Sequence, residues 1–330
     1  MKVKTRHRLK FIFLAVAIVF AGLNLMAYRH VRAMFTYAPG GDRTPKPEFL
    51  SFAGKIRLLI NGVNIPRPEV DVPPSALAVD AVPVTIHLAD RSWISAWYCG
   101  RGADAPLVIL FHGYAACKAY QLREARAFLA MGCSVLMVDF RGSGGSSGSD
   151  TTIGYREADD VAAVVQYARG HFVFSKLVLF GQSMGAAAVL RAIHHDGIRP
   201  DAVIIEAVFD TMLNTVRNRF RIMKVPSFPS AELLVFWGGV QKHFNAFENC
   251  PVRYAVRVTC PALFMHGVDD PRARVADARR VYDAVPGRKQ FVEFPATGHE
   301  SYVARYPSQW TDTVSRFIAG IKADHPRSAP

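Results

Sequence analysis

Short runs of apolar residues, each followed by a turn and then by helical spacing, recur along the chain from about residue 82 onward. A run that is apolar at every position and bounded by turns is typical of a strand covered on both faces. Two earlier segments alternate instead, as the arms of a hairpin do. The continuous runs are 107–111, 134–138, 177–180, 202–205, 262–265 and 290–294, and the hairpin arms are 82–88 and 92–98.

Helical spacing of apolar residues separates these runs. Because strands alternate with helices, the pattern predicts a mostly parallel sheet with helices on both faces. The expected helices lie around Leu122 and Phe128, over 161–167, over 184–193, around Val281 and Ala284, and over 310–321.

One stretch, residues 209–258, breaks the alternation because it contains no clear central strand. Met212, Val216, Phe220 and Met223 recur there at steps of four, four and three, which places them on one helical face. We interpret this stretch as a helical insertion over the sheet.

Near the N-terminus, residues 11–28 are uncharged, and Asn24 is the only strongly polar residue among them. A helix over this run would span about 27 Å, which is enough for the hydrocarbon layer of a membrane. The run is either an uncleaved signal anchor or a signal peptide cleaved after Ala21. We favour the anchor, because the apolar run continues past the cleavage site.

Charge adds an orientation to this picture. The formal net charge is +13, and five of the 40 basic residues lie within residues 2–10. The positive-inside rule keeps that end in the cytoplasm, so we expect the rest of the chain outside it, in the periplasm or, after cleavage, secreted.

Residues 29–80 are rich in Pro and Gly and are expected to be a linker and lead-in, followed by the main domain over 81–325. The sequence contains no tract of basic residues interleaved with aromatic residues, so we expect no nucleic-acid partner.

The sequence contains no strong signal for a metal site, a nucleotide-binding loop or a disulfide. The five cysteines have no CxxC spacing, and no cluster of metal ligands is evident, so neither a metal nor a cofactor is expected. The glycine-rich stretch 142–148 lacks the third glycine of GxGxxG and the Gly-Lys-Ser/Thr ending of a P-loop. Cys250 and Cys260 could form a disulfide, but two separate thiols are the preferred interpretation.

The strongest chemical signal is the pentapeptide Gly181-Gln182-Ser183-Met184-Gly185, between an apolar strand and a helix. A serine on a tight strand-to-helix turn exposes its hydroxyl at the sheet edge, and flanking glycines relieve crowding there. The following helix points backbone N–H groups at developing negative charge. We therefore expect Ser183 to be a nucleophile.

A serine nucleophile needs a histidine base and an acid that orients it, and in folds of this kind both follow the serine in the chain. We favour His299 as the base, because its loop follows the last strand and reaches the carboxyl edge of the sheet. The other histidines after the serine are His194, His195, His243, His266 and His325. Asp269, Asp270 and Asp210 each follow a strand at the same edge, and spacing alone does not separate them.

The oxyanion that forms during acyl transfer needs two backbone N–H donors. One should be Met184, which follows the nucleophile. The other should be Tyr114, in the loop after 107–111, where Gly113 permits a close turn. His112 is expected to be structural.

Together these residues resemble the alpha/beta hydrolase superfamily, and within it the bacterial membrane-anchored serine hydrolases related to the serine aminopeptidase S33 group. The resemblance implies an eight-stranded, mostly parallel sheet with a helical cap after strand six, which corresponds to about 209–258. It also implies Ser183, Asp270 and His299 as the triad, with Tyr114 and Met184 as oxyanion donors. The matching segments are LFHGYAA at 110–116, DFRGSGGSSG at 139–148, GQSMG at 181–185, HGVDD at 266–270 and TGHE at 297–300.

We therefore expect a carboxylesterase-like or lipase-like serine hydrolase that acts on a small-molecule acyl substrate, with an ester preferred to a thioester or amide. The alternatives are an acyltransferase or a catalytically silent membrane-associated binding protein. The sequence predicts no oligomeric state. The apolar side chains of the cap could bind the acyl group or could form the cap's own core; these are Phe220, Phe228, Phe236 and Trp237.

Overall fold

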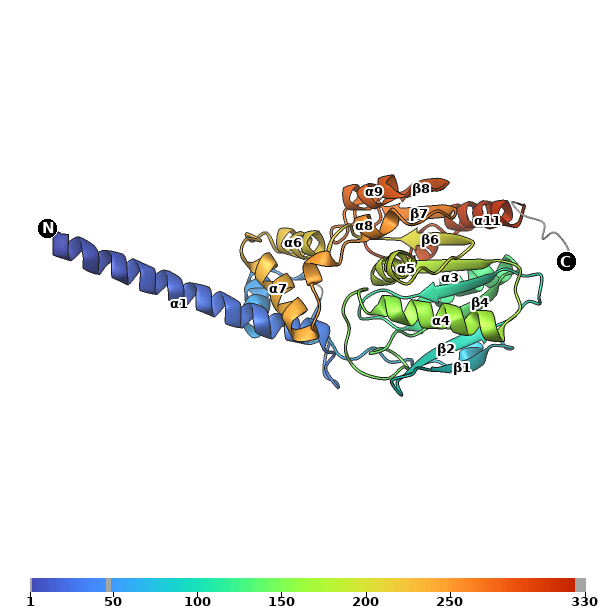
Figure 1. Cartoon of the computed structure of the whole chain (residues 1–330), viewed down its shortest axis with the longest axis horizontal. Helices are drawn as coiled ribbons and strands as arrows, with labels where there is room; N and C mark the ends of the chain where they lie inside the picture. Colours follow the sequence, from blue (N-terminus) through green and yellow to red (C-terminus); the bar gives the residue numbers. More distant parts are fainter. Residues whose placement is uncertain (1, 46–48, 324–330) are drawn as a thin grey trace.

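The computed structural model describes residues 2–45 and 49–323 (Figure 1). Eight strands form one sheet in the order β1-β2-β4-β3-β5-β6-β7-β8, as the resemblance implies. β1 and β2 are antiparallel to their neighbours, and the remaining strands run parallel. The strands are β1 (Val82–His87), β2 (Trp93–Cys99), β3 (Leu107–Phe111), β4 (Ser134–Val138), β5 (Leu177–Gln182), β6 (Ala202–Glu206), β7 (Ala262–Gly267) and β8 (Lys289–Phe294).

Helices cover both faces of this sheet, and side chains that alternate along each strand supply two separate cores. Ile109 of β3 lies in the core under α4 (Glu157–His171), α5 (Met184–His195), α8 (Pro251–Ala255) and α9 (Val275–Ala284). Its neighbour Val108 lies in the opposite core, with α3 (Leu122–Ala130), α10 (Tyr302–Arg305) and α11 (Pro307–Ala323). The central strands are buried at every position of β3 and β4, which explains why they have no alternation in the sequence.

The insertion after β6 is helical, as expected. It contains α6 (Met212–Met223) and α7 (Ser230–Lys242), with α8 leading back to β7. The predicted apolar face of α6 is partly borne out: Met212, Phe220 and Met223 are buried, whereas Val216 is half-buried. In Figure 1, α6 and α7 lie between the sheet and the projecting part of α1.

The N-terminal helix α1 (Lys2–Phe35) continues past Tyr28 and has two different halves. Its segment His7–Phe35 is long and apolar enough to cross a membrane. Figure 1 shows its first half projecting away from the body, whereas its last turns lie beside the cap. Ala27, Val31 and Phe35 are buried there, and Trp237 of α7 bonds through Nε1 to Asn24 Oδ1 at 3.1 Å.

The segment 29–80 is more ordered than its composition suggests. Besides the end of α1, it contains the ten-residue helix α2 (Phe52–Asn61), which sequence spacing does not predict. The helix is short, and Phe52 and Ile56 are apolar residues on its exposed side, so no simple one-sided pattern marks it. Three short 3-10 turns complete the described elements, at Pro74–Ala76, Lys118–Gln121 and Ala246–Glu248.

The cysteines follow the preferred interpretation, because all five are free thiols. The disulfide considered between Cys250 and Cys260 is therefore not formed. The expected domain end at residue 325 lies outside the described residues, as does His325.

Candidate active site

Ser183 lies between β5 and α5 with backbone angles of φ 54° and ψ −109°, a strained conformation for a residue with a side chain. The glycines on either side are required by contact. A Cβ at Gly181 would lie 2.7 Å from the Ala186 backbone nitrogen, and one at Gly185 would lie 2.2 Å from the Phe111 carbonyl oxygen. The Ser183 N–H donates to the carbonyl of Glu206 at 2.8 Å, which ties this turn to β6.

Three side chains from separate strand ends meet at this turn. His299 Nε2 lies 3.0 Å from Ser183 Oγ, and His299 Nδ1 lies 2.6 Å from Asp270 Oδ2. Ser183 follows β5, Asp270 follows β7 and His299 follows β8, so the parallel strands bring the three groups to one edge. The His299 side chain keeps 18% of its surface exposed, whereas the Asp270 side chain has none.

Asp270 divides its two oxygens between backbone and histidine. Oδ1 accepts from the N–H groups of Arg272 at 2.8 Å and Ala273 at 3.0 Å, and Oδ2 faces His299. Burial alone would raise the pKa of Asp270, but the charge and hydrogen bond of His299 lower it below its usual value. Asp270 is therefore fixed as a carboxylate directed at the imidazole.

None of the other described candidate acids and bases is hydrogen-bonded to Ser183 or His299, although His266 Nε2 lies 3.9 Å from Asp270 Oδ2. Asp269 is exposed, and Asp210 is paired with Arg280 at 2.8 Å. His266 is buried and bonded to the Ala273 carbonyl at 2.7 Å, as expected of a packing residue. The remaining described candidates lie at helix ends; these are His194, His195 and His243.

The loop after β3 lies against the Ser183 turn, since a Cβ at Gly113 would be 3.6 Å from Ser183 Cβ. Tyr114 is the next residue. Met184 is the first residue of α5, so its N–H is one of the amides that have no acceptor within the helix. His112 braces this loop: its Nδ1–H donates to the Gly113 carbonyl at 2.8 Å, and its Nε2 accepts from the Phe140 N–H at 3.1 Å. Burial lowers the pKa of His112, which suits a neutral structural ring.

Local sequence pattern does not indicate that the N-terminal segment supports this loop. Tyr114 Oη donates to the Met34 carbonyl at 2.6 Å, and the Ala115 N–H donates to Tyr37 Oη at 3.2 Å. Arg43 donates to the Ala115 carbonyl at 3.1 Å. These contacts join residues about 80 positions apart, and no local pattern could have marked them.

An apolar cavity of about 210 Å³ lies between the N-terminal segment and the cap. Tyr114 and Phe220 line it, whereas Phe228 and Phe236 are exposed and Trp237 packs against Tyr28 of α1. Of the four cap aromatics considered at the sequence level, only Phe220 faces this cavity. The rest of the lining includes Met34, Leu58, Leu59, Val216, Met223 and Leu234, together with Arg43, Arg219 and Arg272.

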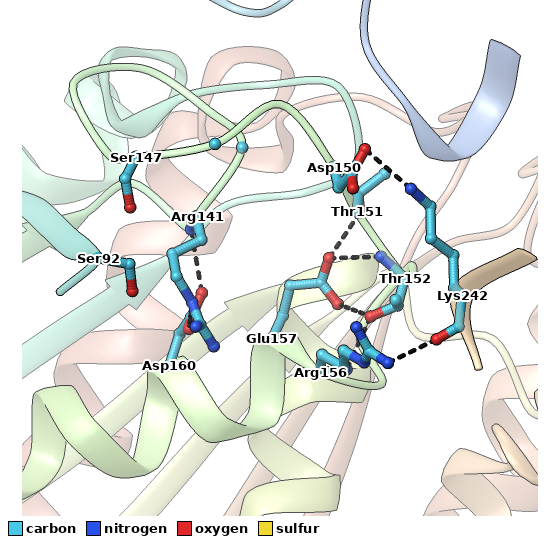
Figure 2. Close-up of a pocket in the computed structure, with 12 residues that line it drawn as sticks. Ser92, Arg141, Ser147, Asp150, Thr151, Thr152, Arg156, Glu157, Asp160 and Lys242 are labelled. Atoms are coloured by element: carbon cyan, nitrogen blue, oxygen red, sulfur yellow. Dashed lines mark hydrogen bonds and ion pairs between the residues drawn. The ribbon is translucent and has the colours of Figure 1, made fainter. Parts of the chain in front are cut away.

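A second hollow, of about 300 Å³, is polar (Figure 2). Its charged side chains bond to one another: Arg141 pairs with Asp160 at 2.6 Å, and Lys242 with Asp150 at 2.8 Å. Figure 2 shows Glu157 at its centre, accepting from Thr151 Oγ1 and from both the N–H and Oγ1 of Thr152. The groups that line it are therefore satisfied by the protein itself.

Behind Ser183, two carboxyl groups are buried. Glu206 Oε1 accepts from Trp310 Nε1 at 2.6 Å, and Glu124 Oε1 accepts from Ser301 Oγ at 2.6 Å. Burial, with the nearby Glu124, raises the pKa of Glu206 to about 8. Among the described residues, no three His, Cys, Asp or Glu side chains are arranged to hold a metal ion.

Known proteins share this fold. The family model described as the alpha/beta hydrolase fold matches residues 106–208. The Bacillus subtilis protein YqkD is 27% identical over 65% of this chain and 72% of its own. The lysophosphatidylserine lipase ABHD12 of Danio rerio is 23% identical over 67% of this chain and 59% of its own. The solved Pyrococcus furiosus esterase Pf2001 superposes with a TM-score of 0.63, at 21% identity, over 78% of this chain and 99% of its own.

The eight-stranded sheet, its helical insertion after β6 and the family match agree with one another. The chain has the alpha/beta hydrolase fold.

Proposed function

We propose that this protein is a serine hydrolase that cleaves an ester bond through an acyl-enzyme on Ser183. The observation that supports this most directly is the continuous chain of contacts from Ser183 Oγ through His299 to Asp270, at 3.0 Å and 2.6 Å. Such a chain couples a hydroxyl to a base whose orientation and charge are fixed by a buried carboxylate.

In the proposed reaction, Ser183 Oγ attacks the ester carbonyl carbon while His299 Nε2 takes its proton. The carbonyl oxygen becomes an oxyanion, which the N–H groups of Tyr114 and Met184 would stabilise. The intermediate collapses by breaking the ester C–O bond, and the imidazolium returns its proton to the departing alcohol. Water then attacks the acyl-enzyme, with His299 as base, and releases the acid and free Ser183.

Relatives favour an ester over an amide or thioester. One relative is named a lysophosphatidylserine lipase, and a solved structure with this fold is named an esterase. The cavity beside Tyr114 combines an apolar wall with three arginines, which suits an acyl chain next to an anionic group. We infer that the substrate is an anionic lipid ester with one acyl chain.

Labelling with a fluorophosphonate probe tests the nucleophile. The wild-type chain should be labelled and Ser183→Ala should not, while equal labelling of both would overturn the assignment.

Activity of the purified enzyme on a panel of substrates tests the substrate class. The panel includes monoacyl phospholipids, neutral monoacylglycerols, thioesters and aminoacyl amides. Preference for a neutral or amide substrate would contradict the inference drawn from the arginines.

Two alternatives remain testable in the same assays. If added alcohols capture most of the acyl group, the protein is an acyltransferase. If neither turnover nor probe labelling is detected, it is a silent binding protein.

We further propose that residues 11–28 hold the protein in a membrane with its catalytic domain outside the cytoplasm. The exposed apolar surface of the first half of α1 supports this. Cleavage after Ala21 would leave Asn24 and the buried turns of α1 in place, so the packing is compatible with either an anchored or a secreted form. The intact mass of the purified protein distinguishes them, and protease accessibility in spheroplasts tests the orientation.

A further inference from the structure

The outward side of the segment that leads into α2 is unusually apolar. Phe52 and Ile56 are four residues apart on one side of α2, and Phe49 lies just before the helix; the three side chains are 69%, 36% and 80% exposed, respectively. Single exposed apolar residues need no explanation, but three large ones within eight residues of the chain suggest a surface that is covered in use.

The inner side of α2 is also apolar and is already occupied. Leu58 and Leu59 line the cavity beside Tyr114. The helix is held to α6 by Lys55 Nζ, which donates to the Ile222 carbonyl at 3.1 Å, and to α1 by the His30 ring, which bonds the Leu58 carbonyl at 3.1 Å. α2 therefore lines the cavity with one side, while its other side is apolar and exposed.

The cap also has exposed apolar side chains. Phe228, in the turn between α6 and α7, is 77% exposed, and Phe236 of α7 is 49% exposed. Figure 1 shows the cap at the end of the body from which α1 projects, with the sheet beyond it. We call the exposed side chains of Phe49, Phe52, Ile56, Phe228 and Phe236 the docking face.

The docking face begins where α1 stops being fully exposed. The ring of Trp237 packs edge-on against Tyr28 at 5.4 Å and bonds Asn24, and the residues before this point include the exposed Phe11, Phe13 and Phe20. Trp and Tyr concentrate where a membrane-spanning helix leaves the hydrocarbon layer. The boundary between lipid-exposed and protein-packed α1 thus lies at the docking face.

From this arrangement we propose that the docking face rests in the interface of the membrane that holds α1, so that a lipid ester enters the cavity from the bilayer past α2. The part concerning substrate entry rests on the proposed function. Because the cavity encloses only about 210 Å³, it would hold part of such a lipid, in line with a substrate that stays partly in the membrane.

Charge favours a bilayer over a second copy of the chain as the occupant. Exposed basic residues lie among the aromatics, at Arg57 of α2 and at Arg221 and Lys224 at the end of α6. Basic and apolar side chains together suit an anionic lipid surface, whereas two such faces would repel each other.

Contact with lipid can be measured without turnover. The full chain is reconstituted in phosphatidylcholine and phosphatidylglycerol vesicles in which the phosphatidylcholine is dibrominated, and the added fluorescence of Phe52→Trp is compared with that of Val173→Trp. Val173 is 70% exposed and lies between α4 and β5, remote from α1 in sequence and fold. The tryptophan at 52 should be quenched several-fold more strongly. Equal quenching at both positions would overturn the docking.

Entry from the bilayer is tested by the triple change Phe49→Ser, Phe52→Ser and Phe228→Ser, with Val79→Ser plus Val173→Ser as the control for exposed apolar residues. Hydrolysis of a bilayer-embedded lipid ester should fall on the order of tenfold in the triple variant, while hydrolysis of a water-soluble acetate ester stays unchanged. Equal loss on both substrates, or no loss on either, would contradict the proposal.

Two further outcomes are informative. A vesicle-free dimer that dissociates in the triple variant would assign the docking face to a second copy and overturn the proposal. If Ser183-dependent turnover is absent altogether, the proposed function fails, but the quenching result still decides whether the face touches lipid.

Discussion

Two of the hollows of this molecule, the polar hollow and the apolar cavity, differ in how their lining groups are bonded. The polar hollow is the larger, at about 300 Å³ against 210 Å³, yet its charged groups bond to one another (Figure 2). The apolar cavity is lined by side chains from α1, α2, α6 and α7 and reaches Tyr114, beside the Ser183 turn. We therefore propose the apolar cavity as the substrate site because of its apolar lining and its position next to the Ser183 turn, and not because of its size.

The largest expected effect is on kcat, and it distinguishes Ser183, beside the apolar cavity, from Ser92, beside the polar hollow. Ser183→Ala should lower kcat by about 10⁶-fold, because nucleophile and base act as one unit. Ser92→Ala, on the wall of the polar hollow, should leave kcat unchanged. Steady-state ester hydrolysis by both purified variants measures this, and a comparable loss in Ser92→Ala would make the polar hollow part of the active site.

A second comparison concerns the adjacent acids. Asp270→Asn should lower kcat by about 10⁴-fold, because an amide no longer stabilises the imidazolium or fixes its tautomer. Asp269→Asn should change kcat less than twofold, since its side chain is exposed and Asp270 keeps its bond to His299. Rates for the two variants on one ester would settle the acid, and the reverse order would move it to Asp269.

Narrowing the apolar cavity should alter which acyl chains are accepted. Val216→Phe adds bulk to the cavity wall and should lower kcat/KM for long-chain esters about tenfold while acetate esters are unaffected. Ser92→Phe, which adds bulk to the polar hollow, should leave the chain-length profile as it is. A profile that is unchanged in Val216→Phe would show that the acyl chain binds elsewhere.

The last comparison concerns stability and follows from a difference in how two buried carboxyls are bonded. Glu157 in the polar hollow accepts four hydrogen bonds, whereas Glu206 behind Ser183 has donors only in Trp310 and, at 3.4 Å, Gln182. Glu206 therefore keeps its proton in the folded chain up to a pKa of about 8, against about 4.3 when unfolded.

Between these two pH values the folded chain holds a proton that the unfolded chain has released. Stability should therefore fall as pH rises from about 4 to 8, by up to about 1.4 kcal/mol per pH unit, and level off above pH 8. Glu206→Gln stays neutral and should remove this loss. Thermal unfolding of both chains between pH 5 and 9 measures the difference, and parallel pH profiles would contradict the expectation.

Local sequence pattern was enough for the sheet. The runs at 107–111 and 134–138 match β3 and β4 to the residue, because strands buried on both faces are apolar throughout. α4 begins at Glu157, four residues before the expected start, because its first turn carries Glu157, Asp159 and Asp160, which suit a helix N-terminus but hide the apolar period.

The candidate site was predictable in outline. Chain order and strand ends indicated Ser183 and His299, but two consecutive aspartates follow β7 at almost the same place. The family resemblance favours Asp270, and in the structure it is Asp270 that bonds His299. The contribution of residues 29–80 was not predictable, because Tyr37 and Met34 reach Tyr114 through tertiary contacts that leave no trace in local composition.

The packing of α7 on α1 has a mechanical consequence. Trp237 and Gln241 bond Asn24 and the Tyr28 carbonyl, and Gly238 leaves room for Phe35 and Val31. Because α1 is one continuous helix, an outward movement of α7 would tilt α1 with it. We therefore expect α7 to stay in place, and any movement that admits substrate to occur at α2, whose contacts include the single hydrogen bonds of Lys55 to Ile222 and of His30 to Leu58.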